Sequence, residues 1–514
     1  MIIVRTSGHL FDHQIRYPAW EASNSQLQHW LKELNIGGVI LLGGSSVELQ
    51  ARSQQLQNLA NIPLFVAADI EEGIGQRFPG GTWFPPPMAL GAIYQQDPVL
   101  AQQYASQMGK ITAREALAVG INWLFAPVVD VNNNPDNPVI NIRAFGESPE
   151  VVCALTAAFI QGAKSTLVLT TAKHFPGHGD TATDSHLDLT ALDHSEARLN
   201  AVELPPFQSA ITAGVDSIMT AHLLISAWDQ DKPATLSNEI MTQHLRNKMG
   251  FDGLIVTDAL IMGGITKFAS PREVAVMAVE AGCDVLLMPD DPEVAIASIY
   301  DGIKSGRIKE EQIQHSLRRI WQAKHRVSQS EAPALNLFCQ SAKSTVSSIL
   351  RDSLQTRGRL PLVPANTAES RNLIVVDDIL NATYLDINSP AVTIPQIYSY
   401  QRQVIDNTTL SNICADSRLT LLQVFIRGNP FRGNSGLTSN TKQLYQQLID
   451  QGQVVGIIIY GSPYAMKWFA SLITDIPLIY SYGQMFQAQE IALNALFDSN
   501  VESSDSKVSA DFGF

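Results

Sequence analysis

One segment of the chain gathers most of the side chains that could do acid–base chemistry. Residues 173–186 read KHFPGHGDTATDSH and hold one lysine, three histidines and two aspartates. Asp184 and His186 are two residues apart, so in an extended backbone both side chains point to the same side. A carboxylate beside an imidazole orients the ring and stabilises its charged form. The pair could therefore serve as a general acid/base that titrates near neutral pH.

Two other interpretations of this segment stay open. The three histidines could bind a metal ion, but their spacing falls across a loop broken by glycine and proline. Such a loop does not fix ligand geometry as a helix would, so we expect no metal site. The segment could also be an ordinary polar surface loop.

Ionisable residues also end most of the apolar runs in the first two-thirds of the chain. Asp258 closes the run at residues 253–259, and similar positions are held by Asp69, Asp130, Lys173, His174, His222 and Asp290. Charged groups are costly to bury without a role. Any one of them could be structural, and Asp258 could simply cap the helix that follows it. So many runs that end in this way indicate a shared site.

The apolar runs themselves have the pattern of strands buried on both faces, which is typical of parallel sheets. Eight of them are rich in Val, Ile and Leu: residues 2–8, 37–44, 63–69, 121–130, 167–175, 216–223, 253–259 and 283–289. Helical patterns such as residues 97–120 lie between them. Eight strand–helix units in about 300 residues predict an α/β fold of the TIM (β/α)8 barrel type, whose active site lies at the carboxyl ends of the strands.

A smaller α/β sheet domain is expected after the barrel. We predict the barrel over residues 1–330, a linker over 331–340 and the second domain over 341–514. An amphipathic segment at residues 310–327 ends the barrel pattern, and the polar stretch SQSEAPALN follows it. The strands expected in the second domain are residues 372–378, 419–426, 454–461 and 476–483.

Composition and charge argue against several kinds of partner. The 514 residues are 45% hydrophobic and 16% charged, with a formal net charge of −14. This balance supports a buried core, whereas an acidic surface suits neither nucleic acid nor an anionic membrane. The four cysteines are widely spaced and form no CxxC, so neither a disulfide framework nor a zinc site is expected. The first residues lack the pattern of a signal peptide, which favours a cytoplasmic location.

These motifs resemble those of a known enzyme family. The segment KHFPGHGDTATDSH is similar to the signature of glycoside hydrolase family 3 β-N-acetylhexosaminidases of the NagZ type, in their two-domain form. Residues 120–150, 218–237 and 250–265 are similar to further blocks of that family, in the same order. The resemblance covers about residues 35–330 and is only loose in the second domain.

The resemblance implies a role for each matching residue. Asp258 would be the nucleophile, and His186 would be the acid/base with Asp184 as its partner. The residues that would bind the sugar are Asp69, Arg77, Arg143, Lys173, His174 and His222. Two positions depart from the family pattern, because Ile74 replaces an arginine and Ala259 replaces an aspartate. Both changes leave the implied catalytic set intact.

The activity that the resemblance implies is that of a retaining exo-β-N-acetylglucosaminidase, a hydrolase that needs no cofactor. Its substrates would be carbohydrates with terminal β-linked N-acetylglucosamine, such as muropeptides of peptidoglycan recycling in cell wall metabolism, or chitooligosaccharides. Three alternatives stay open. They are a β-glucosidase of the same fold, an N-acetylglucosaminide phosphorylase of the same fold, and a non-catalytic muropeptide-binding protein.

Overall fold

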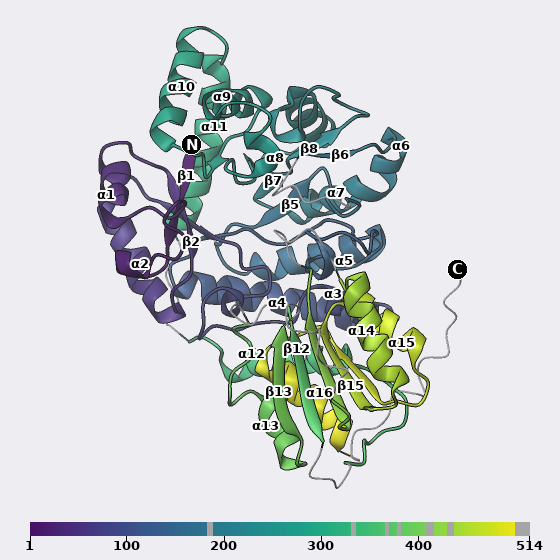
Figure 1. Cartoon of the computed structure of the whole chain (residues 1–514). Helices are drawn as coiled ribbons and strands as arrows, with labels where there is room; N and C mark the ends of the chain where they lie inside the picture. Colours follow the sequence, from purple (N-terminus) through teal and green to yellow (C-terminus); the bar gives the residue numbers. More distant parts are fainter. Residues whose placement is uncertain are drawn as a thin grey trace. The chain divides into compact units, whose positions relative to one another are not determined.

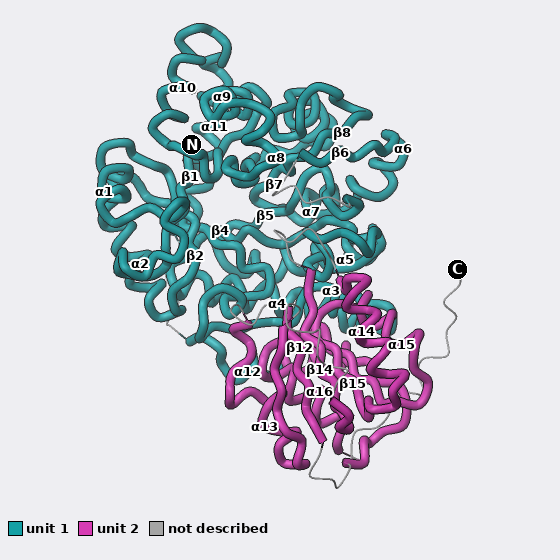
Figure 2. Tube along the Cα trace, viewed as in Figure 1, with its two compact units in different colours: residues 1–345 teal, residues 346–514 magenta. Residues whose placement is uncertain are grey.

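The computed structural model describes residues 1–181, 189–329, 336–364, 370–377, 382–406, 416–428 and 436–498. The chain divides into two compact units, Met1–Thr345 and Val346–Phe514 (Figure 2). Helix α12 (Gln340–Asp352) contains the boundary between them. Of the linker predicted at residues 331–340, the first five residues lie outside the described ranges.

The first unit is built on eight short strands, each inside one of the apolar runs of the sequence. They are β1 (Ile2–Ser7), β2 (Gly38–Leu42), β3 (Phe65–Ala68), β4 (Trp123–Leu124), β5 (Thr171–Phe175), β7 (Ser217–Thr220), β9 (Leu254–Val256) and β10 (Leu286–Leu287). One parallel sheet has the order β10-β1-β2-β3-β4 and another the order β5-β7-β9. Parallel bridges from Trp123 to Leu169 and from Val256 to Val285 join the two sheets into a closed ring. The predicted (β/α)8 barrel is confirmed.

Helices surround this ring (Figure 1). The longer ones are α1 (Asn24–Lys32), α2 (Ser46–Leu59), α3 (Met88–Tyr94), α4 (Pro98–Ala118), α5 (Pro149–Ala163), α7 (Leu204–Ala213), η6 (Glu239–Lys248), α9 (Pro271–Ala281), α10 (Pro292–Lys304) and α11 (Glu310–Ser328). The helices predicted at residues 97–120 and 310–327 are α4 and α11. Side-chain caps mark several starts: the Asp97 carboxylate accepts from the Leu100 amide at the start of α4, and Ser23 forms a capping box with Gln26 at the start of α1. Within the described residues, no helix is both long and apolar enough to cross a bilayer.

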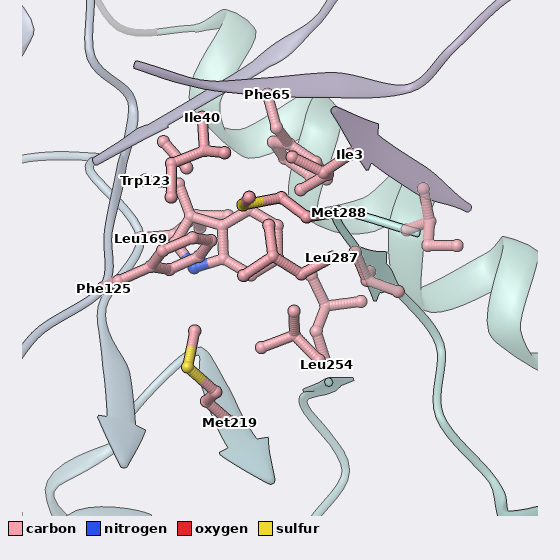
Figure 3. Packing of buried hydrophobic residues seen from close by; sticks show 14 of the residues in the cluster. Ile3, Ile40, Phe65, Trp123, Phe125, Leu169, Met219, Leu254, Leu287 and Met288 are labelled. Atoms are coloured by element: carbon pink, nitrogen blue, oxygen red, sulfur yellow. The ribbon is translucent and has the colours of Figure 1, made fainter. Parts of the chain in front are cut away.

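Trp123 lies at the centre of the barrel core (Figure 3). Its ring packs edge-on against Phe65 and Phe125, with centroids 4.9 and 5.3 Å away. Its indole nitrogen donates to Thr171 Oγ1 at 2.9 Å and to Ser217 Oγ at 3.0 Å. The large apolar ring is therefore buried without leaving its one donor unsatisfied.

Inward-facing side chains lead from this core to the mouth of the barrel. Every second residue of a strand faces the same side. The residue two positions after an inward-facing core residue, nearer the carboxyl end of the strand, therefore also faces inward. These rows run from Ile3 to Arg5, from Phe65 to Asp69, from Leu169 to Lys173 and from Leu254 to Asp258. The alternation of the strands thus directs four charged side chains to the end of the barrel where the active site is expected.

The second unit is a six-stranded sheet with helices, as the sequence predicts. Its strand order is β11-β16-β15-β14-β12-β13, and all neighbours are parallel except β11 and β16. The strands are β11 (Gln355–Arg357), β12 (Arg371–Val376), β13 (Gln401–Asp406), β14 (Thr420–Ile426), β15 (Val454–Gly461) and β16 (Leu478–Ser481). The helices after α12 are α13 (Pro390–Ile397), α14 (Ser439–Asp450), α15 (Pro463–Leu472) and α16 (Phe486–Phe497). The four expected strands are β12, β14, β15 and β16.

Candidate active site

Lys173 lies at the centre of an ion-pair network at the barrel mouth. Its Nζ contacts Asp69 Oδ1 and Glu71 Oε1, both at 2.7 Å. Arg143 ends the short helix η3 (Asn141–Arg143) and binds Glu71 through two nitrogens, at 2.8 Å from Nε and 2.7 Å from Nη2. We call these four side chains the charge network. It joins the loops after β3 and β4 to strand β5, so three neighbouring strand ends are held in one arrangement.

Neighbouring charges keep the two buried members of the charge network, Glu71 and Lys173, ionised. Burial acts to raise the pKa of Glu71, but Arg143 and Lys173 outweigh burial and hold this pKa well below its ordinary value. Burial acts to lower the pKa of Lys173, and Asp69 and Glu71 raise it overall. Two cations and two carboxylates thus balance one another. The Asp69 side chain is 36% exposed, so its carboxylate can contact a ligand. The rest of the charge network holds this carboxylate in place, and the formal charges of the four side chains sum to zero.

Arg77 and Ile74 follow Asp69 in the loop after β3. Arg77 is exposed, and its Nε donates to the backbone oxygen of Asp69 at 3.2 Å. Ile74 begins the short helix η2 (Ile74–Gln76) and is fully buried. The isoleucine that replaces the family's arginine is therefore accommodated as a core residue.

Asp130 fixes the ring of His174. The buried carboxylate accepts from His174 Nδ1 at 2.8 Å and from the backbone amides of His174 and His178. Burial acts to raise the pKa of Asp130, but His174 lowers it overall, so the carboxylate stays ionised. An ionised carboxylate only accepts hydrogen bonds. Nδ1 therefore carries the proton, and Nε2 is the ring nitrogen directed away from Asp130.

His222 is 1% exposed and contacts protein atoms through both ring nitrogens. Nδ1 lies 2.8 Å from Thr235 Oγ1, and Nε2 lies 3.0 Å from the backbone oxygen of Ala259. Because Ala259 follows Asp258 directly, His222 fixes the backbone beside that carboxylate. This geometry suits a positioning residue, and the predicted contact of His222 with the sugar stays a prediction. The contact also does not depend on the Ala259 side chain, which differs from the family pattern.

Asp258 follows β9 and is half-buried. Its Oδ1 accepts from the backbone amide of Ala259 at 2.7 Å. The alternative that Asp258 caps the next helix is wrong. The N-cap of α8 (Gly263–Thr266) is Met262, and that of α9 is Ser270. The carboxylate thus remains at the barrel mouth without a capping role.

Asp184 and His186 lie outside the described residues, but both flanks of their segment are described. Before it, Asp180 Oδ2 contacts His194 Nε2 at 2.9 Å and Arg198 Nη2 at 3.3 Å. After it, β6 (Thr190–Leu192) pairs in parallel with β8 (Leu223–Ile225), which directly follows His222. A side chain on Gly179 would place its Cβ 1.8 Å from the Val131 oxygen, so this motif glycine lets two loops touch. The described flanks are therefore held close to Asp130 on one side and to His222 on the other.

Glu71 was not predicted from the sequence, and Asp130 was predicted only as one of the ionisable residues that end the apolar runs, without a role. Glu71 links both cations of the charge network, and Asp130 orients His174. A usable signal for Glu71 was its place two residues after Asp69, which is the spacing of side chains on one side of an extended chain. Among the residues that the structure describes, no group of three or more His, Cys, Asp or Glu side chains is placed to hold a metal ion.

Replacing Glu71 by glutamine should destabilise the first unit by about 3–5 kcal/mol, because the buried Lys173 and the half-buried Arg143 lose their shared carboxylate. The folded-state pKa of Glu71 is depressed, so its contribution is fully present above the unfolded pKa of about 4.3 and is lost as the pH falls through the lower folded value. Denaturant unfolding of wild type and variant between pH 7 and 3 measures this. The difference should stay constant down to about pH 5 and shrink below about pH 4.

Glu273→Gln is the matched control for this prediction. Glu273 pairs with Arg307 on the surface, where both side chains are well exposed, and such pairs contribute at most about 1 kcal/mol. A Glu71→Gln loss no larger than that of Glu273→Gln would show that the charge network does not stabilise the barrel mouth.

Comparisons with known proteins cover nearly the whole chain. A family model described as "Glycosyl hydrolase family 3 N terminal domain" matches residues 10–323. A second, described as "Bacterial Glycosyl hydrolase family 3 C-terminal domain", matches residues 364–498. Each match lies within one of the two compact units.

Relatives and solved structures agree with these matches. The chain is 37% identical over 339 residues to Beta-hexosaminidase A of Pseudoalteromonas piscicida. The aligned residues make up 60% of this chain and 56% of that protein. It is 38% identical over 279 residues to Beta-hexosaminidase of Tolumonas auensis, covering 54% of this chain and 81% of that protein. A solved glycoside hydrolase family 3 beta-N-acetylglucosaminidase from Paenibacillus sp. str. FPU-7 has a TM-score of 0.80 at 28% identity, covering 96% of this chain and 95% of that one. The chain therefore belongs to glycosyl hydrolase family 3.

Proposed function

We propose that the protein is a retaining exo-β-N-acetylglucosaminidase, which hydrolyses terminal β-linked N-acetylglucosamine. The observation that carries this proposal is the charge network. It closes part of the barrel mouth with fixed polar groups whose charges cancel, which suits an uncharged, hydroxyl-rich ring. The names of the relatives, β-hexosaminidases and a β-N-acetylglucosaminidase, support the same sugar.

Asp258 acts as the nucleophile in this proposal. Its carboxylate attacks the anomeric carbon while His186 protonates the departing oxygen, and a covalent glycosyl-enzyme forms. His186 then takes a proton from water, which attacks the same carbon and displaces Asp258. Two successive inversions retain the configuration of the sugar. Asp184 orients the His186 ring and stabilises its protonated form.

The groups around Asp258 hold the sugar in place. Asp69 accepts hydrogen bonds from sugar hydroxyls, while Lys173 and Arg143 keep its surroundings fixed. The Nε2 atom of His174 and the exposed guanidinium of Arg77 offer further polar contacts. Charge-assisted hydrogen bonds from groups that need not rearrange orient a substrate at low entropic cost. This chemistry requires no cofactor.

Natural substrates within this proposal are muropeptides or chitooligosaccharides that end in N-acetylglucosamine. A part in peptidoglycan recycling in the cytoplasm rests on the motif resemblance. Parallel assays on a N-acetylglucosamine–anhydromuramic acid fragment and on chitobiose would rank the two classes. The product formed in phosphate buffer tests the phosphorylase alternative, since that reaction yields the sugar 1-phosphate. Binding without turnover by freshly purified protein would favour a non-catalytic role.

The proposal predicts strong selection for the N-acetyl group. We expect kcat/KM for a nitrophenyl N-acetyl-β-glucosaminide to exceed that for the matching β-glucoside by about 10²-fold or more, because a site with buried polar groups loses partners when a substrate group is missing. Internal cleavage of a long chitin-like chain should be slow in comparison with release of the terminal sugar. A ratio near one would replace this proposal with the β-glucosidase alternative.

A further inference from the structure

The loop after β1 carries two exposed aromatic rings, Tyr17 and Trp20, which we call the aromatic platform. A turn brings the two rings together in a stacked arrangement, because the backbone amides of Trp20 and Glu21 both donate to the Tyr17 oxygen at 2.9 Å. The ring centroids are 5.9 Å apart, and the ring planes differ by 27°. Tyr17 is 41% exposed and Trp20 is 46% exposed. Exposed aromatic side chains that are paired and held in this way often mark a binding surface.

Arg5 places the aromatic platform at the barrel mouth. Its guanidinium carbon lies 5.3 Å from the centroid of each ring, within the range of a cation–π contact. Arg5 lies two residues after the core residue Ile3 on β1, so its side chain also faces inward. Its Nη2 lies 3.6 Å from Glu21 Oε1. Because the Arg5 side chain faces the inside of the barrel, the two rings that it contacts lie at the opening of the barrel and not on its outer wall.

The strand order relates the aromatic platform to the candidate active site. In the ring, β1 lies between β10 and β2, so β3 with Asp69 is two strands away on one side. On the other side, β9 with Asp258 is two strands away. Burial lowers the pKa of Arg5, and Asp69 and Arg77 are near enough for their charges to act on it as well. The platform thus stands on the rim between the proposed nucleophile and the charge network.

The loop that carries the platform is tied down at several points. The Ala22 amide donates to the Arg5 oxygen at 3.3 Å, which returns the chain to β1. The Asn24 amide donates to Asp12 Oδ1 at 2.9 Å, and the buried Arg52 donates to Asn24 Oδ1 at 2.7 Å. A surface fixed before binding loses little entropy when a ligand settles on it.

We propose that Tyr17 and Trp20 form a subsite for the sugar ring of the leaving group. This inference rests on the proposed function and adds a second recognition element to it. A β-linked gluco-configured ring carries its substituents equatorially, so its faces present C–H groups that match the flat, rigid surface of Trp and Tyr. A patch of two rings is far smaller than the surface a stable protein partner would cover. A single sugar residue is therefore the occupant that fits its size and place.

The test compares two substrates that differ only in the leaving group. Chitobiose has a sugar ring as leaving group, whereas N-acetyl-β-glucosaminyl azide has none. For Trp20→Ala, kcat/KM on chitobiose should fall about tenfold, the size expected for one lost stacking contact. The same variant should hydrolyse the azide within about twofold of wild type. Trp20→Phe should recover most of the chitobiose activity, because a flat ring is restored.

Trp321→Ala is the matched control, since Trp321 is also an exposed tryptophan, on α11. It should leave both activities unchanged. Equal losses on both substrates by Trp20→Ala, or no loss on chitobiose, would overturn the subsite. A change of oligomeric state in Trp20→Ala with unchanged kinetics would assign the rings to a protein interface and overturn it as well. If wild type turns over neither substrate, the proposed function itself fails, and this outcome is distinct from the others.

Discussion

Turnover by Asp258→Ala should fall to below a few per cent of wild type, and roughly 10³-fold or more is expected for the loss of a nucleophile. The reason is positional. Asp258 continues the inward-facing row of β9, its backbone neighbour is fixed by His222, and it caps neither of the helices that follow. Initial rates on a nitrophenyl N-acetyl-β-glucosaminide measure the loss, and an unchanged melting temperature would show that the fold is intact.

Asp290→Ala is the control for this result. Asp290 also follows a barrel strand, β10, but its side chain is exposed. This variant should keep near wild-type activity. A slow fluorinated substrate should label the wild-type peptide that contains Asp258 and no other. Labelling elsewhere, or an Asp258→Ala variant with substantial activity, would require a different nucleophile.

Replacing His186 by alanine should slow hydrolysis of chitobiose by about 10²–10⁴-fold, the usual contribution of a general acid–base group. The loss in the glycosylation step should be much smaller for a dinitrophenyl glycoside, because that leaving group departs without a proton. Pre-steady-state rates of phenolate release separate this step from hydrolysis of the intermediate. An equal deficit with good and poor leaving groups would show that His186 is not the acid.

Asp184→Ala provides the internal comparison for His186. Its carboxylate would act only through the imidazole, so the loss should be smaller than for His186→Ala. The double variant should be little slower than His186→Ala alone, since both residues serve one function. Additive losses would mean that the two side chains act independently.

Local patterns predicted the barrel well because its strands are buried on both faces. Each run of Val, Ile and Leu contains one strand, and the charged residues Asp69, Lys173 and Asp258 continue the inward-facing rows of three of these strands. Two strands of the second sheet, β11 and β13, were missed, and both lie at its edges. Edge strands pack on fewer neighbours, and the sequence of β13, QRQVID, is accordingly polar and half-exposed. An apolar pattern cannot identify a strand that buries little apolar side-chain surface.

The partners within the site could not be predicted from the sequence, because they are chosen by three-dimensional proximity. Arg143 and Glu71 are 72 positions apart, and His174 and Asp130 are 44 apart. The family motif named the residues that would face the sugar, whereas Glu71 and Asp130 act from behind them. His222 was expected to bind sugar, and only the structure places its nitrogens on Thr235 and Ala259.

The anchoring of the loop between β5 and β6 has a consequence for redesign. On one flank, Asp180 pairs with His194 and Arg198, and on the other flank β6 pairs with β8. The charge network is held by ion pairs among its own four side chains. Because these anchors and the charge network use different side chains, a redesign can alter either one through its own substitutions.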